Sequence, residues 1–394
     1  MTQEKIRMIK IKEFGTTGNG CAVHSYLLEN SKGMRVRVLD LGATLQAVEI
    51  PNGDGVLDVA LGYDDVAGYE VNAPWFGAVV GRNCNRIADG AFSIDGVEYT
   101  LGLNEEHVID GHRYWNNLHS EPGGYNKRMY EATTLTVADM NFGEAGAKSG
   151  DAVIFSMTSP DGDQGFPGEL KFSVTYCLTD DNELIINYEG ESDRKTVVNF
   201  TNHSYWNLNG ESAGSIMDHT LKLNALYFTP VDECLIPTGR LGEVEGTVLD
   251  FRAPAKLSDK IAEFTDGHEL GAAASAAMKQ FGICGGYDMN FVIDGEGFRE
   301  AAEITGDQTG IKMTVLTDRP GIQFYSGNFI GEEHGKGGSI YRNREGLALE
   351  TQFYPNAANL ANSEDAVPGI QETCEHCIID AGERFSTTTI YRFE

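Results

Sequence analysis

The sequence predicts an all-β protein, a large antiparallel β-sandwich with few short helices. Short runs rich in β-branched and aromatic residues recur along the chain, and apolar and polar residues alternate within them with a period of two. Turn-forming pairs separate these runs. Asn52-Gly53 follows a strand-like segment, and Asp95-Gly96 lies between two such segments, as is typical of β-hairpins. We therefore expect most of the chain to form antiparallel sheets that pack face to face.

Individual segments support this class in order along the chain. Strands are predicted within residues 34–50 (MRVRVLDLGATLQAVEI), 171–190 (KFSVTYCLTDDNELIINYEG) and 385–393 (FSTTTIYRF). Helical signal is sparse, and residues 255–281 could hold one or two helices, with ELGAAASAAMKQF as the best case. No Pro-rich or Ser-rich linker and no fixed-period repeat divides the chain, so we expect one domain over residues 1–394.

Charge and composition narrow the possible partners. The 30 Lys and Arg residues against 59 Asp and Glu residues give a formal net charge of −29, which disfavours nucleic acid and anionic membrane surfaces as partners. The sequence has no apolar run long enough to span a membrane and no apolar block typical of a signal peptide near residue 1. Seven scattered cysteines, an odd number, suit reduced thiols. These observations predict a cytoplasmic protein.

Common cofactor and catalytic motifs are absent from the sequence. There is no GxGxxG after a strand, no P-loop, no HExxH and no GxSxG. Cys374 and Cys377 form a CxxC, but a structural zinc site needs two further ligands, and no second pair exists. We therefore expect no cofactor and no metal.

One candidate strand, residues 197–208, carries chemically useful side chains on one face. Alternation places Thr201, His203, Tyr205 and Asn207 together, whereas the opposite face is apolar and consists of Val198, Phe200, Trp206 and Leu208. Hydroxyl, imidazole and phenol groups suit the floor of a pocket that binds a polyol. On this pattern alone, His203 would more often be a structural histidine than a catalytic one.

A second candidate strand contains an isolated carboxylate. In GLALETQFYPNAANL, Glu350 shares a face with Gln352 and lies between Leu349 and Thr351. A lone charge is costly to bury, and burial raises a carboxylate pKa toward the range in which it works as a general base. The alternative is a glutamate on an exposed strand face.

Three further segments supply polar candidates. Asp288 and Asn290 share one face of a strand in GICGGYDMNFVID, opposite Met289 and Phe291. The segment GRNCNRIADG groups Arg82, Asn85 and Arg86, whose arginines could bind a ligand or tie a loop to backbone carbonyls. His119 lies in the turn-rich segment NNLHSEPGGYNKR, where sites concentrate but solvated histidines are common.

Taken in order, these segments resemble the aldose 1-epimerase family, also called galactose mutarotases. The resemblance covers nearly the whole chain and includes LGYDDVAGY, PWFGAVVGRNCNRIADGAFSIDGVEYTL, SPDGDQGFPGEL, NFTNHSYWNLNG, IPTGRLGEVEGTVLDFR, PGIQFYSGNF and LALETQFYPNAAN. It implies a galactose mutarotase-like supersandwich and an isomerase that interconverts the α and β anomers of galactose, glucose or a related aldose. A monosaccharide would be the substrate, and we expect a monomer or homodimer.

The resemblance also implies roles for particular residues. His203 matches the family's general acid and Glu350 its general base, which together would open and reclose the sugar ring. His119, Asp288, Asn85, Arg86 and Gln323 match residues that contact the sugar. Where the family commonly has two glycines after the pocket histidine, this chain has Ser120 and Glu121; it also has Met289 after Asp288 and Asn356 after Pro355. None of these departures replaces a presumed catalytic group.

Three other functions compete with this interpretation. A glycosidase would use Asp288 and Glu350 as paired carboxylates. A carbohydrate-binding module would keep the fold without activity. A hexose-6-phosphate 1-epimerase would need local cations, for which Lys127 or Arg128 are candidates.

Overall fold

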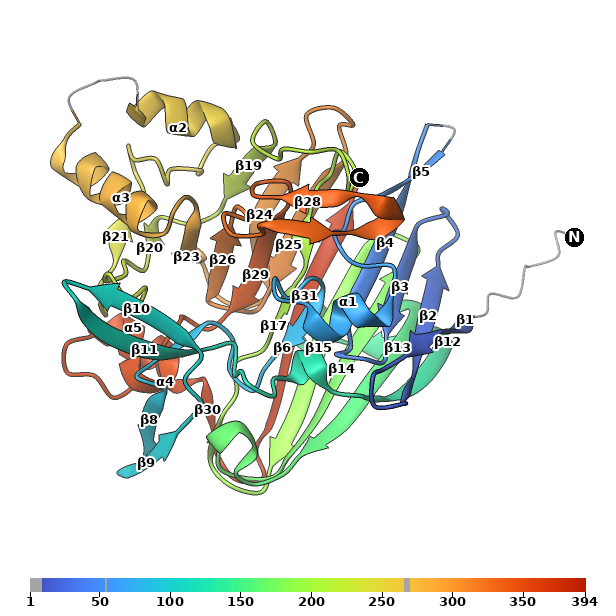
Figure 1. Cartoon of the computed structure of the whole chain (residues 1–394), viewed down its shortest axis with the longest axis horizontal. Coiled ribbons are helices and arrows are strands. Elements are labelled where there is room, and N and C mark those ends of the chain that lie inside the picture. The colour runs from blue at the N-terminus through green and yellow to red at the C-terminus, as the bar shows by residue number, and fades with distance from the viewer. Residues whose placement is uncertain (1–8, 54, 266–269) are drawn as a thin grey trace, which may run out of the picture.

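The computed structural model describes residues 9–53, 55–265 and 270–394. Its largest sheet runs through the middle of Figure 1. The nine strands follow the spatial order β12 (Glu131–Asn141), β13 (Ala147–Ser159), β14 (Leu170–Thr179), β15 (Glu183–Ser192), β31 (Arg384–Phe393), β25 (Lys312–Thr317), β24 (Arg299–Thr305), β19 (Thr220–Leu223) and β22 (Ala255–Lys256).

A second sheet contains the strands with the polar candidates. Its order is β18 (Tyr205–Trp206), β29 (Leu347–Gln352), β26 (Gly321–Tyr325), β23 (Asp288–Val292), β20 (Tyr227–Phe228) and β21 (Gly242–Glu243). All of these pairings are antiparallel. A five-stranded sheet consists of β1 (Lys10–Thr16), β2 (Ala22–Glu29), β3 (Arg35–Leu39), β4 (Leu45–Asn52) and β5 (Gly55–Asp58).

Smaller elements surround these sheets. One three-stranded sheet joins β10 (Glu105–Ile109), β11 (His112–Leu118) and β7 (Arg86–Ala88). The two-stranded pairs are β17 (Thr201–His203) with β6 (Ala78–Val80), β16 (Thr196–Val197) with β30 (Ile378–Ile379), β27 (Glu332–His334) with β28 (Ile340–Arg342), and β8 (Ala91–Ile94) with β9 (Val97–Thr100). The α-helices are short: α1 (Val66–Val71), α2 (Leu257–Thr265), α3 (Ala272–Ile283), α4 (Ala357–Leu360) and α5 (Pro368–Glu375).

The main hydrophobic core lies between the sheets. It combines Phe155 and Tyr176 of the nine-stranded sheet with Phe291 and Leu349 of the six-stranded sheet, and Val36 of the five-stranded sheet also belongs to it. The fold is therefore a large antiparallel β-sandwich, as predicted. Strand β29 is buried on both faces. Its odd-numbered residues Leu347 and Leu349 enter the core, which leaves the face of Glu350 and Gln352 for a second, polar environment.

The predicted hairpins and helices are confirmed. Asp95 and Gly96 have φ values of 51° and 78° and connect β8 to β9, with Ile94 opposite Val97. Positive φ at both positions is what a two-residue turn of this type requires. Strand β4 pairs with β5 around Asn52-Gly53. Helices α2 and α3 lie in the region predicted to be helical, at one end of the molecule (Figure 1).

The prediction of one continuous strand over residues 197–208 is wrong. This segment forms parts of β16, β17 and β18, which pair in turn with β30, β6 and β29. Each short strand therefore belongs to a different sheet. The predicted apolar face is nevertheless correct, since Val198, Phe200, Trp206 and Leu208 all belong to the core. Asn207 does not join the polar group, because its Nδ2 donates to the carbonyls of Gly214 and Glu345.

No helix in the described part of the chain is long and apolar enough to cross a membrane. The extent of the domain over residues 1–394 stays a prediction.

Candidate active site

Strand register brings three polar residues side by side across the six-stranded sheet. Asn290 of β23 lies opposite Gln323 of β26, which in turn lies opposite Glu350 of β29. Strand β17 carries His203 next to this sheet. The predicted alternation on β23 and β29 is therefore confirmed, and it produces a polar floor above an apolar core.

His203 and Glu350 are close neighbours. His203 Nε2 lies 3.6 Å from Glu350 Oε1, and both residues are buried, with 4% and 3% of their surface exposed. The alternative that Glu350 is an exposed strand residue is thus wrong. Two aromatic rings stack against the imidazole at 27°: Tyr205 at 5.0 Å and Trp75 at 6.1 Å between centroids. The imidazole ring is therefore held in place mainly by packing.

His119 lies beside His203. The two imidazole centroids are 5.3 Å apart, and the ring of Trp75 lies 4.7 Å from that of His119. His119 Nδ1 accepts a hydrogen bond from the backbone N–H of Asn85 at 3.1 Å. The neutral ring therefore carries its proton on Nε2, which is the nitrogen available to donate to a ligand.

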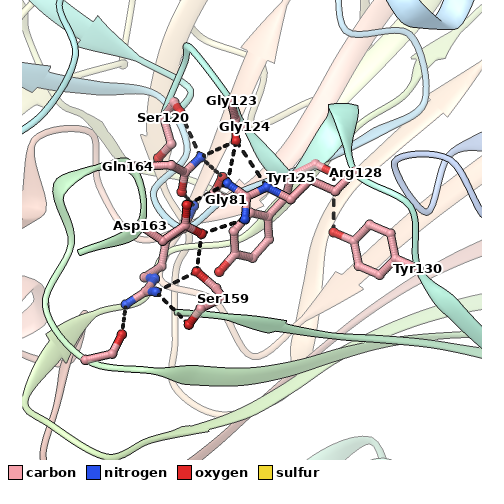
Figure 2. Close-up of polar contacts among 12 residues, drawn as sticks. Gly81, Ser120, Gly123, Gly124, Tyr125, Arg128, Tyr130, Ser159, Asp163 and Gln164 are labelled. Carbon is pink, nitrogen blue, oxygen red and sulfur yellow. Dashed lines mark hydrogen bonds and ion pairs between the residues drawn. The ribbon is translucent and has the colours of Figure 1, made fainter. Parts of the chain in front are cut away.

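A polar network fixes the loop that carries His119 (Figure 2). Gln164 Nε2 donates to the carbonyls of Ser120 at 2.8 Å and Gly123 at 3.2 Å. Asp163, the neighbour of Gln164, forms two hydrogen bonds with Arg128 at 2.6 and 2.8 Å. The network attaches the loop to the segment SPDGDQGFPGEL, and it explains how His119 and Ser120 keep positive φ values of 55° and 56°.

A chain of amide hydrogen bonds leads from Asp288 toward the interior. Gln323 Nε2 donates to Asp288 Oδ1 at 2.6 Å. Gln352 Nε2 donates to Gln323 Oε1 at 3.3 Å and to Asn290 Oδ1 at 3.2 Å. Asp288 also joins Asn85, Arg86 and Gln323 in lining one small cavity. The structure thus brings all seven predicted site residues into one neighbourhood.

The two arginines of the predicted cluster have different surroundings. Arg82 is fully buried, and its Nη1 donates to the carbonyls of Pro167 and Gly168, so it ties loops together. Arg86 lines the cavity with Asp288 and forms a two-pronged contact with Glu105. Arg82 therefore ties loops to backbone carbonyls, whereas contact of Arg86 with a ligand stays a prediction.

The departures from the family pattern leave the pocket residues in place. Ser120 Oγ donates to Asn83 O at 2.8 Å, and the Glu121 carboxylate accepts from Gly123 N at 2.8 Å, so both side chains stabilise the loop. Met289 packs in the core. Asn356 supports the strand of Arg86, because its N–H donates to Arg86 O at 2.8 Å.

Burial dominates the electrostatics of the two central residues. Burial raises the pKa of Glu350 well above its usual value, the charge of Asp288 adds to this rise, and Arg86 opposes it. Burial lowers the pKa of His203 to about 4. The pKa of His119 is lowered well below its usual value by burial and by its neighbours His203 and Arg86. Asp288 has a raised pKa because of its burial. This site therefore favours neutral forms and low charge.

Several neighbouring residues were missed by sequence reasoning. Trp75 and Tyr325 both contact the ring of His203, and Glu105 contacts Arg86. Gln352 was placed on the face of Glu350 but was given no role. Trp75 and Glu105 come from loops and strands outside the six-stranded sheet, so no periodic pattern connects them with the site.

In the described ranges of the chain, no group of three or more His, Cys, Asp or Glu residues could hold a metal ion. Lys127 Nζ donates to the carbonyl of Val71 at 2.6 Å, and Arg128 pairs with Asp163. The two cations considered for phosphate binding therefore already have partners.

Comparisons with known proteins agree with the resemblance. Residues 24–375 match the family described as aldose 1-epimerase. Human galactose mutarotase is 35% identical over 377 residues, which cover 95% of each protein. The aldose 1-epimerase of Escherichia coli is 34% identical over 369 residues, covering 93% of this chain and 94% of that protein.

Solved structures show the same architecture. The GalM/aldose epimerase homologue from C. elegans aligns with a TM-score of 0.73 at 28% identity and covers 94% of this chain and 99% of its own. The galactose 1-epimerase from Lactobacillus acidophilus has a TM-score of 0.76 at 24% identity, covers 98% of this chain and 99% of its own, and supports the fold.

Proposed function

The chain belongs to the aldose 1-epimerase family, and from this premise we propose that His203 and Glu350 are its acid and base. Family membership makes the protein an isomerase that interconverts the anomers of an aldose. The observation that best supports the proposed pair is their geometry. An imidazole and a carboxylate lie 3.6 Å apart on the polar floor, and both are buried.

The reaction requires that the C1 hydroxyl of the sugar loses a proton while its ring oxygen gains one. Glu350 accepts the proton of the C1 hydroxyl while His203 donates a proton to the ring oxygen, so the C1–O5 bond breaks and an open-chain aldehyde forms. Rotation about the C1–C2 bond presents the other face of the carbonyl to O5. Reclosure reverses both transfers, and neither group is consumed. Each group typically contributes about 10²–10⁴-fold to the rate.

The pKa shifts of the pair decide which group holds their shared proton. Burial raises the pKa of Glu350 and lowers that of His203, so in the free enzyme the proton favours the carboxylate, and ring opening uses the form in which it lies on His203. The active form carries a single proton on the pair. We expect a bell-shaped dependence of kcat/KM on pH, whose two limbs report the gain of a second proton and the loss of the shared one.

The remaining site residues hold the sugar. Asp288 accepts from Gln323 Nε2 through Oδ1, which leaves Oδ2 for a sugar hydroxyl. His119 presents its Nε2 proton, and Asn85 and Arg86 line the same small cavity as Asp288. Mixed donors and acceptors of this kind suit a neutral polyol such as galactose or glucose.

A neutral aldose fits this site better than a hexose 6-phosphate. Arg86 is matched by Glu105, and Lys127 and Arg128 have other partners. The net charge of −29 repels dianions at long range. We therefore propose an unphosphorylated aldose as the substrate.

We also propose a cytoplasmic location and a monomeric or homodimeric state. All seven cysteines lie in the described part of the chain and are free thiols, as expected in a reducing compartment.

Polarimetry tests the proposed function directly. Freshly dissolved α-D-galactose and α-D-glucose are followed with and without the protein, and the protein should accelerate the approach to the equilibrium rotation. Release of free sugar from a glycoside with no such acceleration would favour the glycosidase. Binding of galactose without either reaction would favour the carbohydrate-binding module.

A further inference from the structure

Arg86 pairs with the carboxylate of Glu105, which other polar side chains also contact. Glu105 comes from β10 and accepts hydrogen bonds from Arg86 Nε at 2.8 Å and Arg86 Nη2 at 2.7 Å. Asn116 of β11 donates to the same carboxylate at 3.4 Å, and His107 Nε2 lies 3.3 Å from it. Both charged side chains are largely buried, with 11% exposure for Arg86 and 16% for Glu105.

This contact uses one edge of the guanidinium. A bidentate pair occupies Nε–H and one N–H of Nη2, so Nη1 and the second N–H of Nη2 remain for a ligand. Arg86 and Asp288 line the same cavity. The charge of Asp288 raises the pKa of Arg86, and the charge of Arg86 opposes the rise that burial causes in the pKa of Asp288. The group of Arg86, Glu105 and Asp288 therefore carries a net charge of −1 when all three are ionised.

We propose that Glu105 is a specificity-determining residue, which positions Arg86 and cancels its charge so that the site selects uncharged aldoses over aldoses with an anionic substituent. This inference rests on the proposed function, because it assigns Arg86 to the sugar. Without Glu105, Arg86 would offer an unpaired edge that matches a carboxylate or phosphate. With Glu105 in place, an anionic substituent meets an arginine whose charge is already balanced, and an ionised Asp288 adds a negative charge.

The β10–β11 hairpin gives this role a structural basis. Strand β11 pairs with β7, the strand of Arg86, with Leu118 opposite Arg86. Glu105 lies opposite Asn116 in the hairpin, so the hairpin places the carboxylate next to the amide that donates to it. Glu106, the next residue, points elsewhere and pairs with Arg113 at 2.8 Å. The two adjacent glutamates thus provide a matched comparison.

The test measures selectivity as the ratio of kcat/KM for α-D-galactose to kcat/KM for α-D-galacturonate, which carries a carboxylate at neutral pH. In Glu105→Gln this ratio should fall by about tenfold, which equals about 1.4 kcal/mol. Glu106→Gln and Glu105→Asp should keep the ratio of the unmodified protein, since the first leaves Glu105 intact and the second retains its charge. Glu105→Thr serves as a second uncharged variant that suits a strand.

The outcomes separate the two proposals. A fall in the ratio for both uncharged variants, with no fall for the two controls, supports the role of Glu105. An unchanged ratio in an active, folded Glu105→Gln or Glu105→Thr variant overturns it and leaves the proposed function intact. An equal fall in Glu106→Gln also overturns it, because the effect would then come from net charge alone. No acceleration of galactose mutarotation by the unmodified protein would overturn both proposals.

Discussion

Replacing Glu350 with glutamine keeps the size of the side chain and removes its ability to accept a proton. Glu350 is 3% exposed and lies 3.6 Å from His203, so the substitution changes charge at the centre of the site without opening a cavity. Its neighbours on β29, Leu349 and Thr351, face away from the site and remain packed. The variant therefore separates the chemistry of the carboxylate from its packing.

The expected loss of rate follows from the assigned role. A positioned proton-transfer group contributes about 10²–10⁴-fold, so kcat should fall by at least about 10²-fold, or about 2.7 kcal/mol in activation free energy. KM should change much less, because glutamine retains the hydrogen-bonding reach of glutamate. Polarimetric initial rates on α-D-galactose over a range of concentrations give both constants.

The same substitution should stabilise the fold at neutral and alkaline pH. Burial raises the pKa of Glu350 above its value in the unfolded chain. The stability contributed by the protonated form is complete below the unfolded pKa and is lost as pH rises through the folded pKa. Glutamine cannot ionise, so the variant avoids this loss. The difference in Tm, variant minus unmodified protein, should therefore grow as the pH rises above the ordinary titration range of glutamate.

Glu183 provides a matched control. It is also 3% exposed, but it lies in the nine-stranded sheet and pairs with Lys148 at 2.9 Å and Arg392 at 2.8 Å. Glu183→Gln should lower the Tm and keep kcat. A near-native kcat in Glu350→Gln would refute the assignment of the base. A Tm difference, variant minus unmodified protein, that is smaller at pH 8 than at pH 5 would refute the electrostatic reasoning.

Four further predictions address the rest of the site. His203→Asn should lower kcat by about 10²-fold with a smaller change in KM, because it removes the acid; steady-state polarimetry measures both, and an unchanged kcat would contradict the role. Asp288→Ala should raise the KM for galactose more than it lowers kcat, since Asp288 holds hydroxyls; a drop in kcat alone would assign it to the chemistry instead. Treatment with EDTA followed by gel filtration should leave the rate unchanged, and a large loss restored by zinc would show that a metal is needed. Finally, kcat/KM should be higher for glucose than for glucose 6-phosphate, and the reverse order would identify a sugar-phosphate epimerase.

Much of the site could be predicted from local sequence because strands impose a simple rule. Alternation placed Asp288 with Asn290, and Glu350 with Gln352, on faces opposite Met289 and Leu349, and the core confirms this. Across residues 197–208 the same rule placed the apolar face correctly, but the expected continuous strand is divided into β16, β17 and β18, which pair with three different partners. Alternation holds within one strand, but it says nothing about where the chain changes from one sheet to another.

The sequence by itself determined the antiparallel sandwich, its hairpins and the family, because these follow from period-two patterns, turn residues and ordered motifs. Only the tertiary structure decided which charges meet. Glu350 is separated from His203 by 147 positions in sequence (350 − 203), and their 3.6 Å contact arises because β17 packs beside β29. Likewise, the hairpin β10–β11 brings Glu105 to Arg86. Burial and charge pairing, which set the pKa of each group, depend on such long-range contacts, and no local pattern in the chain encodes them.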